Sequence, residues 1–339
     1  MSCYITSVGA ALPERIVTNA EIARILEVTP GWIEANSGIK ERRWVSPDQA
    51  ASNLAVKAMQ DSLSSAGLSS DQIDYLIGCT LSPDYQMPGV APIVQHKLAG
   101  CRSIPAVDIR SGCVGILYSF QLARSLVESG AAKLVGCFGT EAQSKGLNLS
   151  HNSAELSMLF GDGAGAMLVT NDIELSRKSG CCLRVDDILI GTDGSFAEDL
   201  AIKSPGTANG ANWLDTEAIA AGKHFGSMNG RNVILQAVRK MSEAAIEIAE
   251  RNNVALERID LVIPHQANAN LLKALCKKLS LPEDRVVINL DLFGNTSSAA
   301  AFLALWQAVR DERLKSGMTV MILAFGSGFT WGAALCKCI

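Results

Sequence analysis

The stretch IPAVDIRSGCVGILYSFQLARSLVESG (residues 104–130) decides the fold of this chain. A turn of small residues joins an apolar, strand-like run (104–109) to a helical pattern, and Cys113 falls at or near the start of that helix. The free N–H groups and the positive dipole end of a helix N-terminus favour a thiolate, so this position predicts a lowered pKa for Cys113. Taken alone, however, a free cysteine is more often a small buried apolar residue.

The same order of elements recurs in the second half of the chain. A helix, linker and strand pattern at 53–83 matches one at 234–267, and the stretch 104–130 matches 286–317. Short apolar strands that alternate with amphipathic helices predict an α/β protein with a mostly parallel sheet. A period of about half the chain indicates duplication of one α/β unit rather than a solenoid.

The duplication predicts two halves, residues 1–172 with the cysteine and residues 173–339, with a boundary where the apolar pattern breaks near 170–180. Corresponding positions in the two copies should face each other across a pseudo-twofold axis. On this alignment Cys113 corresponds to Asn295, because each follows a glycine and opens a helix.

Composition argues against several classes of protein. The chain has 339 residues, of which 48% are hydrophobic, 19% charged and 5% aromatic, and its net charge is −4. It shows no basic run for nucleic acid, no transmembrane stretch of about 18 apolar residues, and no secretory signal pattern. Its ten cysteines lack zinc-ligand spacing and indicate a reducing compartment. We therefore expect a cytoplasmic protein with no bound cofactor or metal, and with neither nucleic acid nor a membrane as partner.

Three separated segments carry candidate catalytic residues: GCVG around Cys113, IPHQAN around His265 and FGNTSSAA around Asn295. His265 follows the apolar strand run 260–264, and strand ends are where α/β folds hold ligands. A core histidine and a turn asparagine are the structural alternatives for the last two residues. Together the three form a Cys/His/Asn set that the duplication places at one end of the sheet.

The chain resembles the β-ketoacyl-acyl carrier protein synthase III family of thiolase-fold condensing enzymes. The resemblance runs nearly end to end and rests on the Cys113 segment and six further motifs: GAALPERIVTNAEI (9–22), WIEANSGIKER (32–42), FGDGAGAMLV (160–169), VIPHQANANLL (262–272), LFGNTSSAA (292–300) and AFGSGFTWGAAL (324–335). It implies two duplicated α/β halves with mixed sheets in a five-layered α-β-α-β-α arrangement. It also implies a homodimer.

The resemblance implies an acyltransferase of the 3-oxoacyl-acyl carrier protein synthase III type. Cys113 would take an acyl group from an acyl-coenzyme A or an acyl-carrier protein. A malonyl thioester, with malonyl-acyl carrier protein expected, would then condense with it by decarboxylation to give a 3-oxoacyl product. His265 and Asn295 would donate to the enolate, and the backbone N–H groups of Cys113 and Ser327 would form an oxyanion hole. Fatty-acid initiation and a specialised lipid or polyketide pathway both stay open.

The resemblance also implies positions for the substrate and the carrier protein. Four residues are expected to bind the substrate and its pantetheine limb: Trp32, Met228, Asn268 and Phe325. Three are expected to dock the acidic carrier protein: Lys273, Lys277 and Lys278. A structural tryptophan and a solvated lysine face are the alternatives for Trp32 and the lysines.

Three positions depart from the family pattern. Asn36, Ala154 and Asn270 stand where the family commonly has arginines that grip phosphate or stack on adenine. Their loss predicts a weaker dependence on the nucleotide of coenzyme A. The stretch 197–224 is also longer than in short family members, and the polar region 192–231 around it is expected to form a pocket rim or a mobile cover.

Two other functions stay open at this point. Acyl transfer from Cys113 to an alcohol or amine, without decarboxylation, would use His265 as a general base. A non-catalytic subunit of a condensing heterodimer is the second. Asn295 favours condensation, because simple transfer has no enolate to stabilise, and the presence of all three candidate residues argues against a non-catalytic subunit.

Overall fold

The computed structural model describes residues 2–178, 181–209 and 212–339. Within these residues the largest sheet has nine strands. In order across the sheet they are β11 (Leu261–Pro264), β12 (Thr319–Gly326), β13 (Thr330–Cys338), β8 (Leu183–Thr192), β1 (Cys3–Ala11), β7 (Gly163–Thr170), β6 (Leu134–Glu141), β4 (Tyr75–Cys79) and β5 (Ala106–Ile109). Two small antiparallel ladders pair β2 (Arg15–Thr18) with β3 (Glu41–Trp44), and β9 (Leu200–Ile202) with β10 (Gly226–Met228).

The helices range from single turns to a helix of 22 residues. In chain order they are α1 (Asn19–Leu26), α2 (Pro30–Ser37), α3 (Ala51–Ala66), α4 (Val90–Lys97), α5 (Gly115–Glu128), α6 (Ala154–Ser157), α7 (Ile173–Lys178), α8 (Thr216–Ala220), α9 (Gly230–Arg251), α10 (Ala269–Leu279), α11 (Leu290–Phe293) and α12 (Ala300–Arg310). The polar region 192–231 thus holds β9, α8 and β10 in addition to loops.

The nine-stranded sheet consists of two halves with the same strand pattern. In the first half β4 pairs in parallel with β5 and β6, and β7 and β1 continue antiparallel. In the second half β11 pairs in parallel with β12, and β13 and β8 continue antiparallel. A single parallel bridge between Val262 and Val286 stands where the first half has β5. A short ladder between β1 and β8 joins the two halves.

This shared strand pattern supports the division into residues 1–172 and 173–339, which we propose as the domain organisation. The break in apolar pattern on which the boundary rests, near 170–180, includes α7. It also includes residues 179 and 180, which lie outside the described residues.

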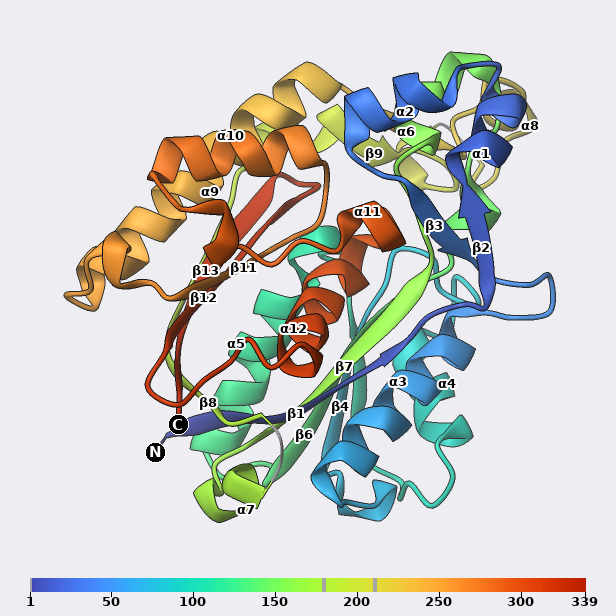
Figure 1. Ribbon diagram of the computed structural model, residues 1–339. Helices are drawn as coiled ribbons and strands as arrows, with labels where there is room; N and C mark the ends of the chain where they lie inside the picture. The colour runs from blue at the N-terminus through green and yellow to red at the C-terminus, as the bar shows by residue number, and fades with distance from the viewer. Residues whose placement is uncertain (1, 179–180, 210–211) are drawn as a thin grey trace.

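Three clusters of buried apolar side chains separate five layers (Figure 1). Helices α3 and α4 pack on the first half of the sheet, and α9 and α10 pack on the second half. Helices α5 and α12 lie between the two halves, where their apolar side chains contact strands of both. Burial of apolar area on both faces of the sheet stabilises this stacking. The five-layered α-β-α-β-α arrangement expected from the sequence is confirmed.

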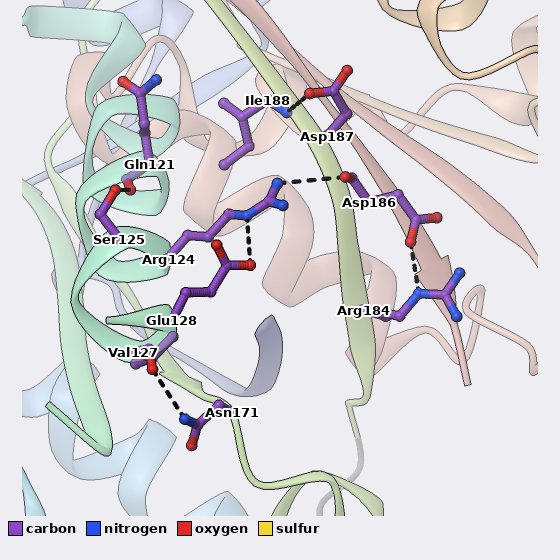
Figure 2. Close-up of polar contacts among 10 residues, drawn as sticks. All are labelled: Gln121, Arg124, Ser125, Val127, Glu128, Asn171, Arg184, Asp186, Asp187 and Ile188. Carbon is purple, nitrogen blue, oxygen red and sulfur yellow. Dashed lines mark hydrogen bonds and ion pairs between the residues drawn. The ribbon is translucent and has the colours of Figure 1, made fainter. Parts of the chain in front are cut away.

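Polar contacts fasten α5, one of the two central helices, to its neighbours (Figure 2). Arg124 Nε donates to Glu128 Oε1 at 2.9 Å, and Arg124 Nη1 donates to the carbonyl of Asp186 on β8 at 3.4 Å. Asn171 Nδ2 donates to the carbonyl of Val127 at 3.0 Å, in the last turn of the helix. These contacts fix the C-terminal end of α5, and the same rigid helix carries the candidate site at its other end.

Within the residues that the structure describes, no helix combines the length and the apolar character that crossing a membrane needs. The same residues contain no group of three or more His, Cys, Asp or Glu side chains arranged to hold a metal ion. All ten cysteines are free thiols.

Candidate active site

Cys113 lies in a 3₁₀ turn, η2 (Gly112–Val114), between the end of β5 and the start of α5. Its predicted position near the N-terminus of a buried helix is confirmed. Gly112 opens the turn with a φ of 55°, and a Cβ there would lie 3.0 Å from Ser327 Oγ. Glycine suits this position because it adopts positive φ without strain and leaves space for Ser327. The Cys113 side chain is only 8% exposed.

The surroundings of Cys113 shift its pKa in the direction opposite to the one that the helix start predicts. Burial is the largest cause and raises the pKa of Cys113 to about 12, and the nearby Glu141 carboxylate acts in the same direction. A hydrogen bond from Cys113 Sγ to Ser297 Oγ, at 3.7 Å, lowers that pKa in part. A thiolate at this depth would lose its water, which outweighs the dipole of the helix. The unliganded site therefore holds a neutral thiol.

Glu141, at the end of β6, is a fully buried residue of the site that sequence reasoning missed. Its carboxylate accepts from the backbone N–H of Leu81 at 3.1 Å, from Ser82 Oγ at 2.5 Å and from the backbone N–H of Ser298 at 3.3 Å. These donors come from segments far apart in the chain, so Glu141 fastens the two halves together beside Cys113. Burial raises the pKa of Glu141. A carboxylate at the end of an otherwise apolar strand is the sequence signal that could have indicated it.

Asn295 lies just before a second 3₁₀ turn, η9 (Ser297–Ala299), which opens α12. Its Oδ1 accepts from the backbone N–H of Ser297 at 2.8 Å, and its backbone N–H donates to the carbonyl of Leu159 at 2.8 Å. Because the side-chain partner is an N–H group, the atom facing it must be the oxygen, which directs Nδ2 away. Among the described residues, nothing accepts a hydrogen bond from Nδ2, so this donor is available to a ligand.

The glycine-rich segment 160–169 packs against Asn295. The backbone N–H of Gly161 donates to the carbonyl of Asn295 at 3.1 Å. The buried carboxylate of Asp162 accepts from the backbone N–H groups of Val45 and Ser144, each at 2.8 Å. These contacts hold the loop that supports the asparagine.

His265 follows β11 directly, as the sequence predicts, and is 3% exposed. Its backbone N–H donates to the carbonyl of Leu323 at 2.7 Å, and its Nδ1 has no hydrogen-bond partner. Burial lowers the pKa of His265 to about 3, so the imidazole is neutral around pH 7 and offers one N–H donor. The next residue, Gln266, fixes this loop: its Nε2 donates to the carbonyls of Pro264 and Val287, each at 2.9 Å.

The end of β12 lies against the turn that carries the thiol, and β11 is its neighbour in the sheet. Because β11 and β12 are parallel and Pro264 pairs with Leu323, His265 lies level with the last residues of β12. Gly326, the last residue of β12, packs on Cys113, where an added Cβ would lie 3.0 Å from Cys113 Cβ. The hydrogen bonds of Ser297 link the thiol to Asn295 in turn.

A cavity of about 540 Å³ extends from Cys113. Its lining includes Ser297 and Ser327, which places the expected oxyanion-hole residues Cys113 and Ser327 on one cavity. The long stretch 197–224 contributes β9 and residues on either side of its loop, in agreement with its expected role as a pocket rim. Residues 210 and 211 of that stretch lie outside the described residues.

None of the four residues expected to bind substrate belongs to this lining. Trp32 and Met228 pack, partly buried, against the same apolar cluster near α2. Asn268 caps α10, with its Oδ1 accepting from the backbone N–H of Asn270 at 2.8 Å. Phe325 is 4% exposed and packs in the core between the sheet and α9. Their contact with a substrate stays a prediction.

Two of the three positions that depart from the family pattern, Asn36 and Asn270, are in contact at the junction of α2 and α10. Asn36 Nδ2 donates to the carbonyl of Trp32 at 2.8 Å, and Asn270 Nδ2 donates to the carbonyl of Ala35 at 3.2 Å. The Asn270 amide also donates to the carbonyl of Asn36 at 3.2 Å, so it fastens the start of α10 to the end of α2, whereas the Asn36 amide donates within α2. Ala154 is buried at the start of α6.

Lys273, Lys277 and Lys278 are exposed on α10. In the described part of the chain none of the three forms an ion pair or a side-chain hydrogen bond. Their charges are therefore available to an anionic partner.

Comparisons with known proteins agree with this geometry. The family model described as 3-oxoacyl-[acyl-carrier-protein (ACP)] synthase III matches residues 107–185, and its C-terminal counterpart matches residues 249–338. The β-ketoacyl-[acyl-carrier-protein] synthase III of Clostridium perfringens is 37% identical over 98% of this chain and 98% of its own. That of Nitratidesulfovibrio vulgaris is 38% identical over 97% of both.

A crystal structure is similar over the same extent. The 3-oxoacyl-[acyl-carrier-protein] synthase III of Aquifex aeolicus superposes with a TM-score of 0.86 at 32% sequence identity, and covers 99% of both chains. The likeness therefore includes both halves of the sheet and the two central helices.

Proposed function

The chain belongs to the 3-oxoacyl-[acyl-carrier-protein] synthase III family, and on this premise we propose a two-step acyl transfer and condensation centred on Cys113. Cys113 first takes an acyl group from an acyl-coenzyme A or an acyl-carrier protein. A malonyl thioester, carried by acyl carrier protein, then loses carbon dioxide and condenses with the bound acyl group to give a 3-oxoacyl product. The observation that carries this proposal is the buried thiol in the lining of a cavity of about 540 Å³, linked through Ser297 to Asn295.

The first step is a thiol–thioester exchange. Cys113 Sγ attacks the acyl carbonyl, the new thioester forms, and the departing thiol receives the proton. Because burial raises the pKa of Cys113 to about 12, we infer that the proton leaves only as the substrate engages and not in the empty site. The backbone N–H groups of Cys113 and Ser327 would stabilise the tetrahedral oxyanion.

The second step places negative charge on the thioester oxygen of the malonyl group as carbon dioxide leaves. Asn295 Nδ2 and the N–H of a neutral His265 would donate to that oxygen. The carbanion then attacks the Cys113 thioester, and the released sulfur recovers a proton. A pKa of about 3 makes His265 a weak base and a persistent neutral donor, which supports condensation over an acyl transfer that needs His265 as general base.

Incubation of the protein with a panel of acyl thioesters, followed by intact-protein mass spectrometry, tests the first step. We expect one acyl group to be added, and peptide mapping to locate it on Cys113. Addition of malonyl-acyl carrier protein should then remove the adduct and release a 3-oxoacyl product. An adduct at any other cysteine, or one that malonyl thioesters leave in place, would contradict the proposal.

We also propose a homodimer. β5 is the last strand of the sheet and pairs only with β4 among the described residues. Val107 on this strand is 37% exposed, and the loop after β4 exposes Tyr85 at 63% and Met87 at 87%. An open apolar edge of this kind favours pairing with a second copy. Light scattering should give the mass of two chains, and Val107→Asp should lower it toward one. A wild-type mass near one chain would refute the dimer.

The three lysines of α10 are proposed to dock the acidic carrier protein. Lys273 and Lys277 lie on one face of the helix at i, i+4 spacing. Substitution of both by glutamate should raise KM for malonyl-acyl carrier protein and leave KM for malonyl-pantetheine unchanged. An equal effect on the two substrates would rule out docking at this face.

A further inference from the structure

The imidazole of His265 places its two nitrogens in different surroundings. Nδ1 is buried without a hydrogen-bond partner, whereas Nε2 is not fully buried and makes no hydrogen bond with a described residue, so Nε2 faces accessible space. A neutral ring carries one proton, and only a proton on Nε2 can be donated to a ligand there. We propose that Asn289 is the positioning residue that keeps this proton on Nε2: its Nδ2 donates to His265 Nδ1, directly or through one buried water. The inference rests on the proposed function, because it assigns the tautomer that condensation uses.

Asn289 carries a side-chain amide that the fold does not otherwise use. The residue is 3% exposed and stands at the N-cap position of α11, yet its side chain makes no capping hydrogen bond. Its Nδ2 is buried and has no partner among the described residues. An asparagine at an N-cap normally caps the helix, and buried polar atoms are normally satisfied. An acceptor for this N–H donor is therefore expected close to the amide.

The strand register places Asn289 level with His265. The segment that leads into α11 lies beside β11 (Figure 1), with a parallel bridge between Val262 and Val286. The next residue of each segment points into the apolar cluster around α5 and α12. Side chains alternate along extended segments, so two residues farther on His265 and Asn289 point to this same side.

Gln266 maintains this register beyond the bridge. Its Nε2 donates to the carbonyl of Val287 at 2.9 Å, and its Oε1 accepts from the backbone N–H of Asn289 at 3.1 Å. The side-chain amide of Gln266 thus takes the place of a peptide group between the two segments. Neighbouring strands lie about 4.8 Å apart, a separation that a direct hydrogen bond or one bridging water spans. The two orphaned atoms, one on each segment, are therefore within reach of each other.

The two orphaned groups are complementary in one tautomer of the ring only. Asn289 Nδ2 is a donor, so His265 Nδ1 must be the acceptor, and the single ring proton is then fixed on Nε2. The opposite orientation of the amide would present Oδ1 and fix the proton on Nδ1, so the tautomer reports the contact. Burial is the only cause that shifts the pKa of His265, so no charged side chain competes with this amide for the ring.

Nitrogen NMR of protein labelled in its histidine rings reads the tautomer directly. The chain has four histidines, and subtracting the spectrum of His265→Ala isolates the ring in question. At pH 9 the wild type should show a protonated Nε2 and an unprotonated Nδ1. In Asn289→Asp, Nδ1 should become protonated, because a carboxylate accepts a hydrogen bond and cannot donate one. Asn289→Leu should give a mixture of the two tautomers.

Asn19→Asp is the matched control. Asn19 is also buried, at 7% exposure, and its Nδ2 donates to the carbonyl of Ile39 at 2.6 Å, in another part of the fold. This substitution should leave the His265 tautomer unchanged. Because the wild-type tautomer is read without any substitution, the test holds even where a variant fails to fold.

Two rates separate this inference from the proposed function. Acylation of Cys113, measured by intact mass, should stay near the wild-type rate in both Asn289 variants. Release of carbon dioxide from a malonyl thioester should fall about 10²-fold in Asn289→Asp, as for loss of one oxyanion donor, and severalfold in Asn289→Leu. A wild-type proton on Nδ1, or a tautomer unchanged in both variants, would overturn the inference. A changed tautomer with unchanged decarboxylation would uphold the contact and contradict the role of His265 in condensation.

Discussion

The turn that opens α5 and the turn that opens α12 have the same backbone form but carry different chemistry. Each begins with a residue of positive φ, Gly112 at 55° and Ser297 at 47°, and continues as a 3₁₀ turn. Matched in this way, Cys113 corresponds to Ser298. Asn295, which the sequence alignment pairs with Cys113, instead lies just before the second turn. The two turns therefore share a backbone form and place different side chains at the site.

The first residue of each turn explains why one turn has a glycine and the other a serine. A residue other than glycine at positive φ costs about 1–2 kcal/mol, and the first turn avoids this cost with Gly112. The second turn retains Ser297, whose Oγ accepts from Cys113 Sγ and whose N–H holds Asn295 Oδ1. A strained serine is kept where it connects the thiol of one half to the amide of the other.

The largest effect is expected from removing the thiol of the first turn. Cys113→Ser should abolish self-acylation by any acyl thioester, because a serine hydroxyl is barely ionised and lacks the nucleophilicity of sulfur. Intact-protein mass spectrometry reads this directly. Cys276→Ser is the matched control, because Cys276 has a similar exposure of 7% and lies on α10. Acylation of Cys113→Ser at the wild-type rate would show that the nucleophile lies elsewhere.

The raised pKa of Cys113 predicts a strong pH dependence of its reaction with iodoacetamide. A thiol with a pKa of about 12 is neutral throughout pH 7–9.5, so its alkylation rate should rise about tenfold per pH unit without a plateau. Subtracting the Cys113→Ser rate at each pH isolates this residue. If the alkylation rate reached a plateau below pH 8, the helix dipole would lower the pKa of Cys113 more than burial raises it. The first turn would then stabilise a thiolate.

Dependence on the nucleotide of coenzyme A should be small. The side-chain amides of Asn36 and Asn270 donate to backbone carbonyls of α2, and neither residue carries the positive charge with which an arginine binds phosphate. One acyl group on coenzyme A and on pantetheine should therefore acylate Cys113 at rates within about tenfold, since each lost charge-assisted contact removes about 1.5–3 kcal/mol. A hundredfold faster acylation by the coenzyme A thioester than by the pantetheine thioester would show that other residues bind the nucleotide.

The smallest effect is expected in the second turn. Ser297→Ala removes the hydrogen bond that lowers the pKa of Cys113, so the thiol should ionise less and alkylation at pH 8.5 should slow severalfold, as for loss of one hydrogen bond. Ser297→Gly should slow alkylation equally and also relieve the positive φ, as Gly112 does in the first turn. If alkylation is unchanged in both variants, Ser297 does not couple the two turns.

Sequence reasoning reached the elements that local pattern determines. Cys113 at a helix start and His265 at a strand end follow from short motifs, and the paired order of strands follows from the repeat. One error was the direction of the Cys113 pKa, because the helix start is visible in the sequence and the depth of burial is not. That depth depends on β12 and η9 closing over the thiol from the other half. Another was the mostly parallel sheet: three pairings of the nine-stranded sheet are parallel and five are antiparallel, because β7, β1, β13 and β8 continue each half without a parallel crossover.

Residues that act through distant contacts carry at most a weak local signal in the sequence. Glu141 looks like the polar end of a strand until Leu81 and Ser298 are seen to donate to it. Asn289 looks like an ordinary helix cap until the hydrogen bonds of Gln266 are seen to hold it level with His265. These residues come together only when the chain folds, so no local sequence motif marks this part of the site.

The division of labour between the two turns is tested most directly by His265→Ala and Asn295→Ala. For each variant, acylation of Cys113 is measured by intact mass, and malonyl decarboxylation is measured as release of carbon dioxide from the same protein. We predict that acylation stays near the wild-type rate while decarboxylation falls about 10²-fold or more, because each variant loses one donor to the enolate. If either variant loses acylation as severely as decarboxylation, that residue activates the thiol, and the assignment of separate roles to the two halves is wrong.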